Sequence, residues 1–176
     1  MTVFDMLPAC FALAGAVLLV VAAVRRGDLT AAIKAHDLLP ARLVRLAPLA
    51  GPAEGLAGAA VLACWLIAET RLLRFAAAAV ALWYLALAVY LAVLLRRRGK
   101  VPCGCLDETS PASAVKVGRA VLLALATAPL VAGWPPVPAE TSARLLACGL
   151  AAFTAGFLIV AGTLADLQGT SAAHGQ

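Results

Sequence analysis

Cys103 and Cys105, one residue apart, are the residues of this 176-residue chain whose type and spacing best suit chemistry. The thiolate form of cysteine attacks disulfides, and the glycine between the two cysteines lets the chain bend sharply. A disulfide between them would close a small, strained ring, and strained disulfides exchange readily. The pair therefore favours a redox shuttle over a permanent cross-link.

The residues around this pair act on a thiolate in opposite directions. The basic cluster at 96–98 stabilises negative charge, and so does the N-terminus of the next helix, where Ser110 suits the N-cap and Pro111 the first helical position. The acidic pair at 107–108 opposes them. The sequence therefore leaves the net effect on the thiols open.

Two other interpretations of the pair compete with redox chemistry. A structural zinc ion needs four ligands, but only these two cysteines lie here and His36 is the sole plausible histidine nearby, so no metal site is predicted. Unreactive loop cysteines are the second alternative. The remaining cysteines, Cys10, Cys64 and Cys148, stand singly in apolar stretches and are expected to be small buried hydrophobes.

The composition around these cysteines is that of a membrane protein. Hydrophobic residues make up 64% of the chain, charged residues 13%, and the mean hydropathy is +0.98. A stretch of about 20 apolar residues crosses a bilayer as a helix. Five such stretches predict an all-α polytopic helix bundle with one domain, 1–176, and a polar tail at 167–176. The stretches are 3–24, 49–68, 73–95, 114–134 and 145–166.

Basic residues follow the ends of these stretches, which indicates topology and headgroup contacts rather than nucleic-acid binding. Five spans place the two long connections, 25–48 and 96–113, on one side. Only Arg71, Arg74 and Arg144 of the fourteen basic residues lie on the other. The positive-inside rule therefore predicts a cytoplasmic Cys103–Cys105 loop. No basic residue precedes the first stretch, so we expect a helix there and not a cleaved signal peptide.

The sequence also predicts how several groups of side chains pack. The aromatic residues Trp83, Tyr84 and Tyr90 precede the basic cluster and are expected to anchor the third helix at the interface. Small residues four apart predict close helix contacts. These are Gly51, Gly55, Ala59 and Ala63 in the second helix, with Ala152 and Gly156 in the fifth. The connection before the second helix predicts a short amphipathic helix around 38–46.

Two ionisable residues lie within predicted spans. Glu54 is a functional candidate because a carboxylate at membrane depth is costly, or it complements the dipole of a helix that starts near Pro52. Arg119 is expected to pair with Glu54, to hold an anionic group, or to snorkel. By contrast, Lys34, His36 and Asp37 are expected in a solvated loop.

The order of these motifs resembles the methylamine-utilisation MauE family over residues 8–134. The matching segments are "LAPLAGPAEGLAGAAVLA", the CGC and "VKVGRAVLLAL". The resemblance extends more loosely to the DoxX group and to the vitamin K epoxide reductase class, which implies a four-helix core. It also implies a redox role for Cys103 and Cys105, with Glu54 as a proton relay and Arg119 in the same site.

The resemblance further implies a function in disulfide formation or maturation of exported proteins, in the cell (plasma or inner) membrane, with a thioredoxin-like partner and an exported client. A quinone is left open as the membrane-side electron partner. The family's usual Cys-Gly-Cys-Phe-Gly ends in Leu106 and Asp107 here, and Ala120 follows Arg119 where Asn is common. These departures weaken a link to methylamine metabolism itself.

Two questions stay open at this point. Exported clients require the thiols outside the cytoplasm, whereas the charge distribution places them inside. The chain is either a thiol–disulfide oxidoreductase, or a non-catalytic assembly subunit whose cysteines stabilise a loop. A small transporter is a weaker third candidate, because only Glu54 and Arg119 lie at membrane depth and no inverted repeat is visible.

Overall fold

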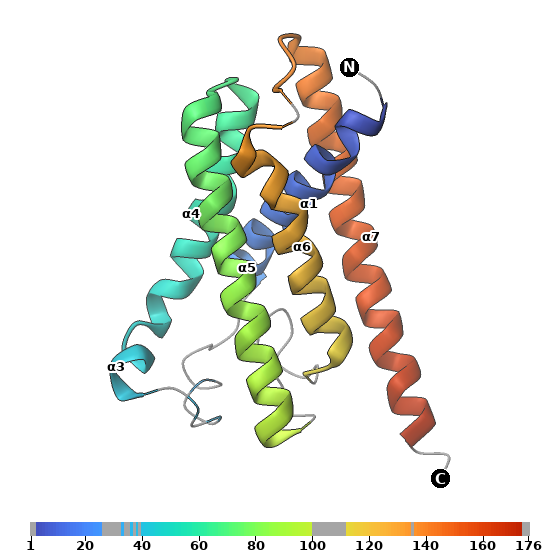
Figure 1. Cartoon of the computed structure of the whole chain (residues 1–176). Helices are drawn as coiled ribbons and strands as arrows, with labels where there is room; N and C mark the ends of the chain where they lie inside the picture. Colours follow the sequence, from blue (N-terminus) through green and yellow to red (C-terminus); the bar gives the residue numbers. More distant parts are fainter. Residues whose placement is uncertain are drawn as a thin grey trace.

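The protein is an all-helical bundle in the computed structural model, which describes residues 3–25, 33, 36, 38, 40–99, 112–134 and 136–173. The long helices are α1 (Val3–Arg25), α4 (Ala47–Leu66), α5 (Thr70–Arg98), α6 (Ala114–Ala132) and α7 (Thr141–Ala173), and α3 (Ala41–Val44) is a single turn (Figure 1). Each of these five long helices is long and apolar enough to span a membrane. The predicted polytopic helix bundle is confirmed.

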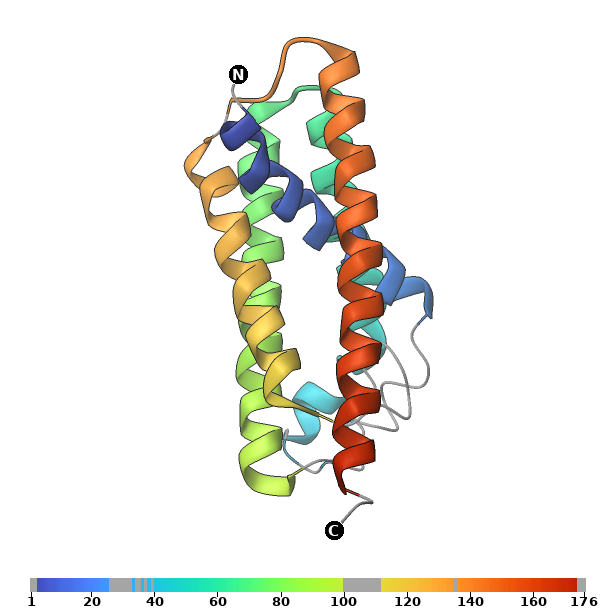
Figure 2. The ribbon, with the colours of Figure 1, turned by 90° about the vertical axis from the view of Figure 1, so that its right-hand side faces the viewer.

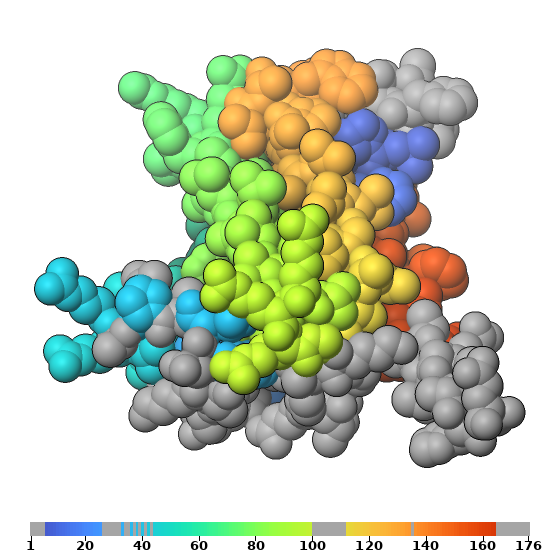
Figure 3. Space-filling model, turned by 60° about the horizontal axis from the view of Figure 1, so that its bottom comes forward, coloured from blue at the N-terminus to red at the C-terminus, as the bar shows by residue number. Residues whose placement is uncertain are grey.

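The helices alternate in direction between the two ends of the bundle. The start of α1, the turn between α4 and α5 and the connection between α6 and α7 lie at one end (Figure 1). The opposite end holds α3, the end of α5 and the start of α6, and Figure 3 shows this face. Both long connections therefore leave and rejoin the bundle at the same end, as the five-span topology predicts.

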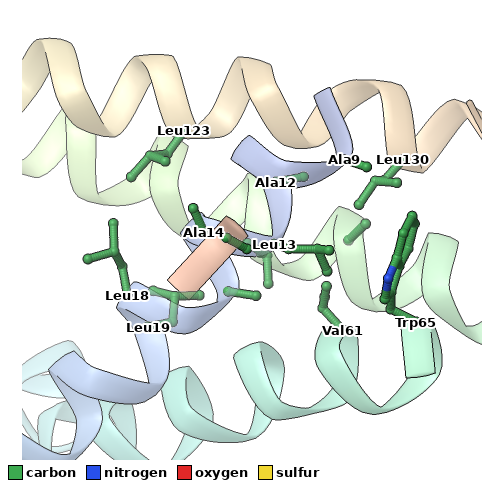
Figure 4. Packing of buried hydrophobic residues seen from close by; sticks show 14 of the residues in the cluster. Ala9, Ala12, Leu13, Ala14, Leu18, Leu19, Val61, Trp65, Leu123 and Leu130 are labelled. Atoms are coloured by element: carbon green, nitrogen blue, oxygen red, sulfur yellow. The ribbon is translucent and has the colours of Figure 1, made fainter. Parts of the chain in front are cut away.

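Helix α1 is the centre of the bundle. It packs extensively against α4, α6 and α7 and touches α5, and it crosses the bundle obliquely (Figure 2). In its membrane-spanning window 56% of the residues are buried, against 28% in α4, α5 and α6 and 17% in α7. Its buried side chains are mostly alanines and leucines, and they meet Val61 and Trp65 of α4 and Leu123 and Leu130 of α6 (Figure 4).

Helix α4 approaches α1 through a face that the sequence did not single out. Its buried side includes Glu54, Gly58, Val61 and Trp65. A Cβ atom placed on Gly58 would lie 2.5 Å from the backbone oxygen of Ala16, so only glycine permits this approach. The predicted stripe of small residues four apart is largely wrong. Only Gly55 makes a close contact, while Gly51 faces open space and Ala59 and Ala63 are exposed.

Helix α7 packs on α1 through Ala147, Ala151 and Ala155, which are all buried. The predicted pair is wrong by one residue, since Ala152 is exposed and Gly156 has nothing within 4 Å of a Cβ placed on it. The helix also continues to Ala173, through most of the predicted tail at 167–176. In a bilayer the lipid-facing and protein-facing sides are similarly apolar, so hydrophobicity alone does not fix the rotation of a helix.

Trp83 and Tyr84 point their polar atoms to buried groups and do not anchor α5 at an interface, whereas an anchoring role of Tyr90 stays a prediction. Tyr84 is buried and its hydroxyl donates to the backbone oxygen of Gly15 at 2.7 Å. The hydroxyl of Tyr90 lies 2.6 Å from Nδ1 of His36, which is itself buried rather than solvated. The indole nitrogen of Trp83 likewise donates to a buried acceptor, Oε1 of Glu54. The polar tips of these side chains therefore serve groups inside the protein, as buried Tyr and Trp usually do.

Two helix starts differ from expectation. Helix α6 begins at Ala114, and the hydroxyl of its N-cap, Ser113, accepts from the backbone N–H of Lys116 at 3.4 Å. The predicted Ser110 cap is therefore wrong for this helix, because Ser113 occupies the position from which a side chain reaches the N3 amide. Helix α4 begins at Ala47, upstream of Pro52. Glu54 consequently lies two turns inside the helix and does not cap its start.

Arg144 fastens α7 to α4 at the end of the bundle where α1 starts. Its Nη1 donates to the backbone oxygen of Leu66 at 2.6 Å, and its Nη2 donates to Oγ1 of Thr141 at 3.0 Å. In return, Nε1 of Trp65 donates to the backbone oxygen of Arg144 at 3.4 Å. The terminal carbonyls of a helix lack intrahelical partners, so this cation stabilises the C-terminus of α4.

The close approach at Gly58 predicts a sharp difference between two glycines of α4. Gly58→Ala should destabilise the protein by about 1–3 kcal/mol, because the added methyl group must push α1 and α4 apart. Gly51→Ala should be neutral or stabilising by about 0.5–1 kcal/mol, because alanine favours the helix and the site is open. Equilibrium unfolding in detergent micelles measures both. Equal effects at the two positions would contradict the α1–α4 contact.

Candidate functional site

A polar cavity lies between α1, α4, α5 and α6, on the side of the bundle toward the two long connections. Its volume is about 50 Å³ and its walls are mostly apolar, but four ionisable or polar side chains reach it. Those four are Glu54, Tyr84, Lys116 and Arg119. The apolar lining comprises Leu18, Leu19, Ala22, Leu87, Leu91, Ala120 and Leu123. Figure 4 shows three of these lining residues, Leu18 and Leu19 side by side on α1 and Leu123 on α6.

Glu54 is the most deeply buried charged residue of the cavity, with 2% of its surface exposed. Its Oε1 accepts a hydrogen bond from Nε1 of Trp83 at 2.8 Å. Glu54 precedes Gly58 by one turn, so both lie on the helix face that contacts α1. Because Gly58 allows α4 to lie close to α1, the carboxylate of Glu54 lies inside the bundle. Of the two interpretations of Glu54, the structure supports the buried group rather than the helix-start carboxylate.

Tyr84 forms the wall of the cavity opposite Glu54 and ties α5 to α1. Its hydroxyl donates to the backbone oxygen of Gly15. A Cβ atom placed on Gly15 would lie 3.3 Å from the ring of Tyr84, so glycine at this position makes room for the ring. A backbone oxygen in the middle of a helix already accepts one bond and has a second lone pair for the hydroxyl. The contact fixes the phenol at the edge of the cavity.

Two cations reach the cavity from the first turns of α6. Lys116 and Arg119 are three residues apart and therefore share a helix face. The guanidinium of Arg119 makes no hydrogen bond or ion pair with any described residue, so the predicted pairing with Glu54 is not found. It extends instead toward α7, where a Cβ atom placed on Gly162 would lie 3.1 Å from its Nη1. Glu54 and Arg119 share the cavity without touching.

Cys103 and Cys105 lie outside the described residues, so their role remains a prediction. Their segment joins Gly99, which follows α5, to Ala112, which precedes α6. Ala112 is fully buried against Leu91 and Leu94 of α5, and Leu91 also lines the cavity. The chain that carries the two thiols therefore rejoins the bundle directly beside the polar cavity.

The other three cysteines lie within spanning helices. Cys10 and Cys64 are buried and Cys148 is half-buried, which agrees with the prediction for small apolar residues. No group of three or more His, Cys, Asp or Glu side chains gathers in the ranges that the structure describes. No ligand set for a metal is therefore visible within those ranges.

Sequence reasoning found Glu54 and Arg119 but missed Trp83, Tyr84 and Lys116. The sequence itself contains one indication that Trp83 and Tyr84 lie deep within the membrane span. Trp83 precedes Arg96 by thirteen residues, which corresponds to about 20 Å along an α-helix. An aromatic residue that far from the basic cluster lies deep in the span, and not at the interface where that cluster lies.

One known protein family matches this chain. The sequence model described as methylamine utilisation protein MauE matches residues 4–135. The chain belongs to the MauE family. Every described residue that lines the cavity falls inside the matched region, which covers α1 from its second residue and all of α4, α5 and α6, whereas α7 follows it. No curated protein and no solved structure matches the chain. The looser likeness to the DoxX group stays a prediction.

The Trp83–Glu54 hydrogen bond leads to a prediction about stability in this MauE-family protein. Trp83→Phe should destabilise it by about 1.5–3 kcal/mol, because a buried carboxylate loses a donor. In a double-mutant cycle with Glu54→Gln, we expect a coupling of at least about 1 kcal/mol. Trp134→Phe is the matched control, since Trp134 is 48% exposed and should change stability by less than about 0.5 kcal/mol. Additive effects of the first two substitutions would contradict the interaction.

Proposed function

We propose that this chain is a membrane-embedded thiol–disulfide redox protein that assists disulfide formation or maturation of exported proteins with a thioredoxin-like partner. The polar cavity carries the proposal. A buried carboxylate and two cations lie beside the point where the segment with Cys103 and Cys105 rejoins the bundle. The family match and the five spans fit a multi-pass membrane protein of methylamine utilisation.

The proposed reaction is a two-step exchange between the loop cysteines and a partner disulfide. The thiolate of one loop cysteine attacks a partner sulfur, which forms a mixed disulfide and releases the other partner sulfur as a thiolate. The second loop cysteine then attacks the mixed disulfide. The loop pair is oxidised to a disulfide and the partner disulfide is reduced to two thiols, with no net change in protons. Disulfide formation in clients uses the same steps in reverse, so that the loop disulfide oxidises the partner dithiol. A membrane oxidant of the quinone class then accepts the two electrons and reoxidises the loop dithiol.

The groups in the cavity suit the proton and charge changes of this exchange. Each attack requires a thiol to lose its proton, and each departing thiolate later accepts one. Glu54 is the proposed relay for these protons, because it is the carboxylate that lines the cavity among the residues that the structure describes. Lys116 and Arg119 lie in surroundings where water does not screen charge strongly, so their attraction for a thiolate is larger than in solution.

Replacement of the loop cysteines tests the proposal directly. In cells that produce Cys103→Ser or Cys105→Ser, exported disulfide proteins should accumulate reduced thiols, because neither variant completes the exchange. Gel shifts after alkylation with a large maleimide report the fraction of reduced clients. Cys148→Ser is the matched control and should leave that fraction unchanged, since this half-buried cysteine lies in α7.

The same measurement separates the redox function from the non-catalytic alternative. If clients form disulfides normally in both loop variants, the redox proposal fails. If Gly58→Ala alone impairs client maturation, the bundle acts as an assembly subunit that depends on helix packing.

The side of the membrane that the loop faces gives a second prediction. Exchange with exported clients requires a membrane-impermeant maleimide to label Cys103 and Cys105 in intact cells after reduction, and to label them poorly before it. Cys10, Cys64 and Cys148 are replaced by alanine for this experiment so that only the loop thiols react. Labelling that requires permeabilised cells would place the loop in the cytoplasm, as the basic residues predict, and would exclude exchange on the export side.

A further inference from the structure

Arg119 is a cation within a spanning helix, and no described residue pairs with it. Its side chain is half-buried and lines the polar cavity, and its Nη1 reaches the backbone of α7 at Gly162. A guanidinium stays charged and presents five N–H donors, so its position at membrane depth is costly unless an acceptor compensates it. This side chain is placed to bind an anion.

The space that Arg119 enters lies between two helices that hardly pack on each other. Helix α6 packs against α5 and α1, and α7 packs against α1 and α4, but no extensive contact joins α6 to α7 in their described parts. Figure 2 shows the two helices running apart, with α1 crossing between them. Gly162 contributes no side chain to this space. The guanidinium of Arg119 therefore bridges the separation between α6 and α7.

The surroundings indicate that a ligand would reach Arg119 from the lipid phase. The cavity is lined by α1, α4, α5 and α6, and none of the α7 side chains that the structure describes contributes to it. On α7 the side chains of Phe157, Val160 and Leu164 are large, apolar and more than half exposed. Side chains of this kind face acyl chains in a bilayer. A molecule that passes between α6 and α7 would meet apolar surface outside, Arg119 next and the polar cavity last.

We propose that Arg119 and the cavity behind it form a site for the anionic head group of a membrane amphiphile, which enters between α6 and α7. Among the described residues that line the cavity, cations outnumber carboxylates, since Lys116 and Arg119 accompany one acid, Glu54, whose Oε1 already accepts from Trp83. The planar fork of a guanidinium matches phosphate or carboxylate oxygens in two parallel hydrogen bonds. The apolar tail of the ligand stays between the helices. This site requires no thiol chemistry.

Binding of dodecyl phosphate to the purified full chain in neutral detergent tests the site, with native mass spectrometry and thermal shift as the two readouts. Arg119→Gln should weaken binding at least about 10-fold, the size expected for the loss of a charged hydrogen bond. Gly162→Leu should weaken it as strongly, because the new side chain displaces the guanidinium. Gly156→Leu is the matched control on the same helix and should bind normally, since its Cβ position is open.

Two further compounds identify which part of the ligand is recognised. Dodecanol has the tail without the charge, and inorganic phosphate has the charge without the tail, so both should bind at least about 10-fold more weakly than dodecyl phosphate. Equal binding of dodecanol would overturn recognition of the anion, and equal binding of inorganic phosphate would overturn a lipid-borne ligand. Unchanged affinity in both Arg119→Gln and Gly162→Leu would overturn the site itself. Circular dichroism and gel filtration confirm that each variant is folded.

A variant without both loop cysteines separates this inference from the proposed redox function. Cys103→Ser combined with Cys105→Ser should bind dodecyl phosphate as the native chain does, because the proposed site consists of Arg119 and the cavity side chains of α1, α4, α5 and α6. Loss of binding in that variant would overturn a site that is independent of the thiols. Retained binding, together with normal client disulfides in the same variant, would support this site and reject the redox function alone.

Discussion

The arrangement of the bundle depends on the close contact between α4 and α1 at Gly58. At this point a single methyl group would collide with the backbone oxygen of Ala16. The contact fixes both the rotation of α4 and its distance from the central helix. Because Glu54 lies one turn before Gly58, that rotation turns a carboxylate toward the interior rather than toward lipid. The polar cavity is thus a consequence of a packing contact between two helices.

Burial of Glu54 in turn constrains its neighbours. A carboxylate in surroundings of low polarity needs hydrogen bonds and positive charge to remain stable. Trp83 supplies a donor, and two cations from α6 lie across the same cavity. Tyr84, the residue after Trp83, is held by the backbone of Gly15 and closes the wall. Two adjacent aromatic residues of α5 therefore complete a site whose charged members come from α4 and α6.

The sequence predicted the elements of this fold better than their orientation. The five spans, the shared end of the long connections and the presence of Glu54 and Arg119 in one region followed from hydropathy, charge and spacing. Rotation did not, because two stripes of α4 contain small residues at helical spacing. The one starting at Gly51 looked more regular, yet the one through Gly58 makes the contact. Lipid and protein interior are equally apolar, so only side-chain contacts distinguish the two stripes.

The cavity belongs to the part of the chain that matches the family, and the last helix lies outside that part. Residues 4–135 contain nearly all of α1 and the whole of α4, α5 and α6, together with the described side chains that line the cavity. Helix α7 lies beyond that region and packs on α1 through alanines near its own start, where Arg144 also ties it to α4. Farther along, no extensive contact joins α7 to α6 in their described parts, and Arg119 reaches toward Gly162. The four-helix core supplies the charged groups of the cavity, and α7 lies beside this core through its packing on α1.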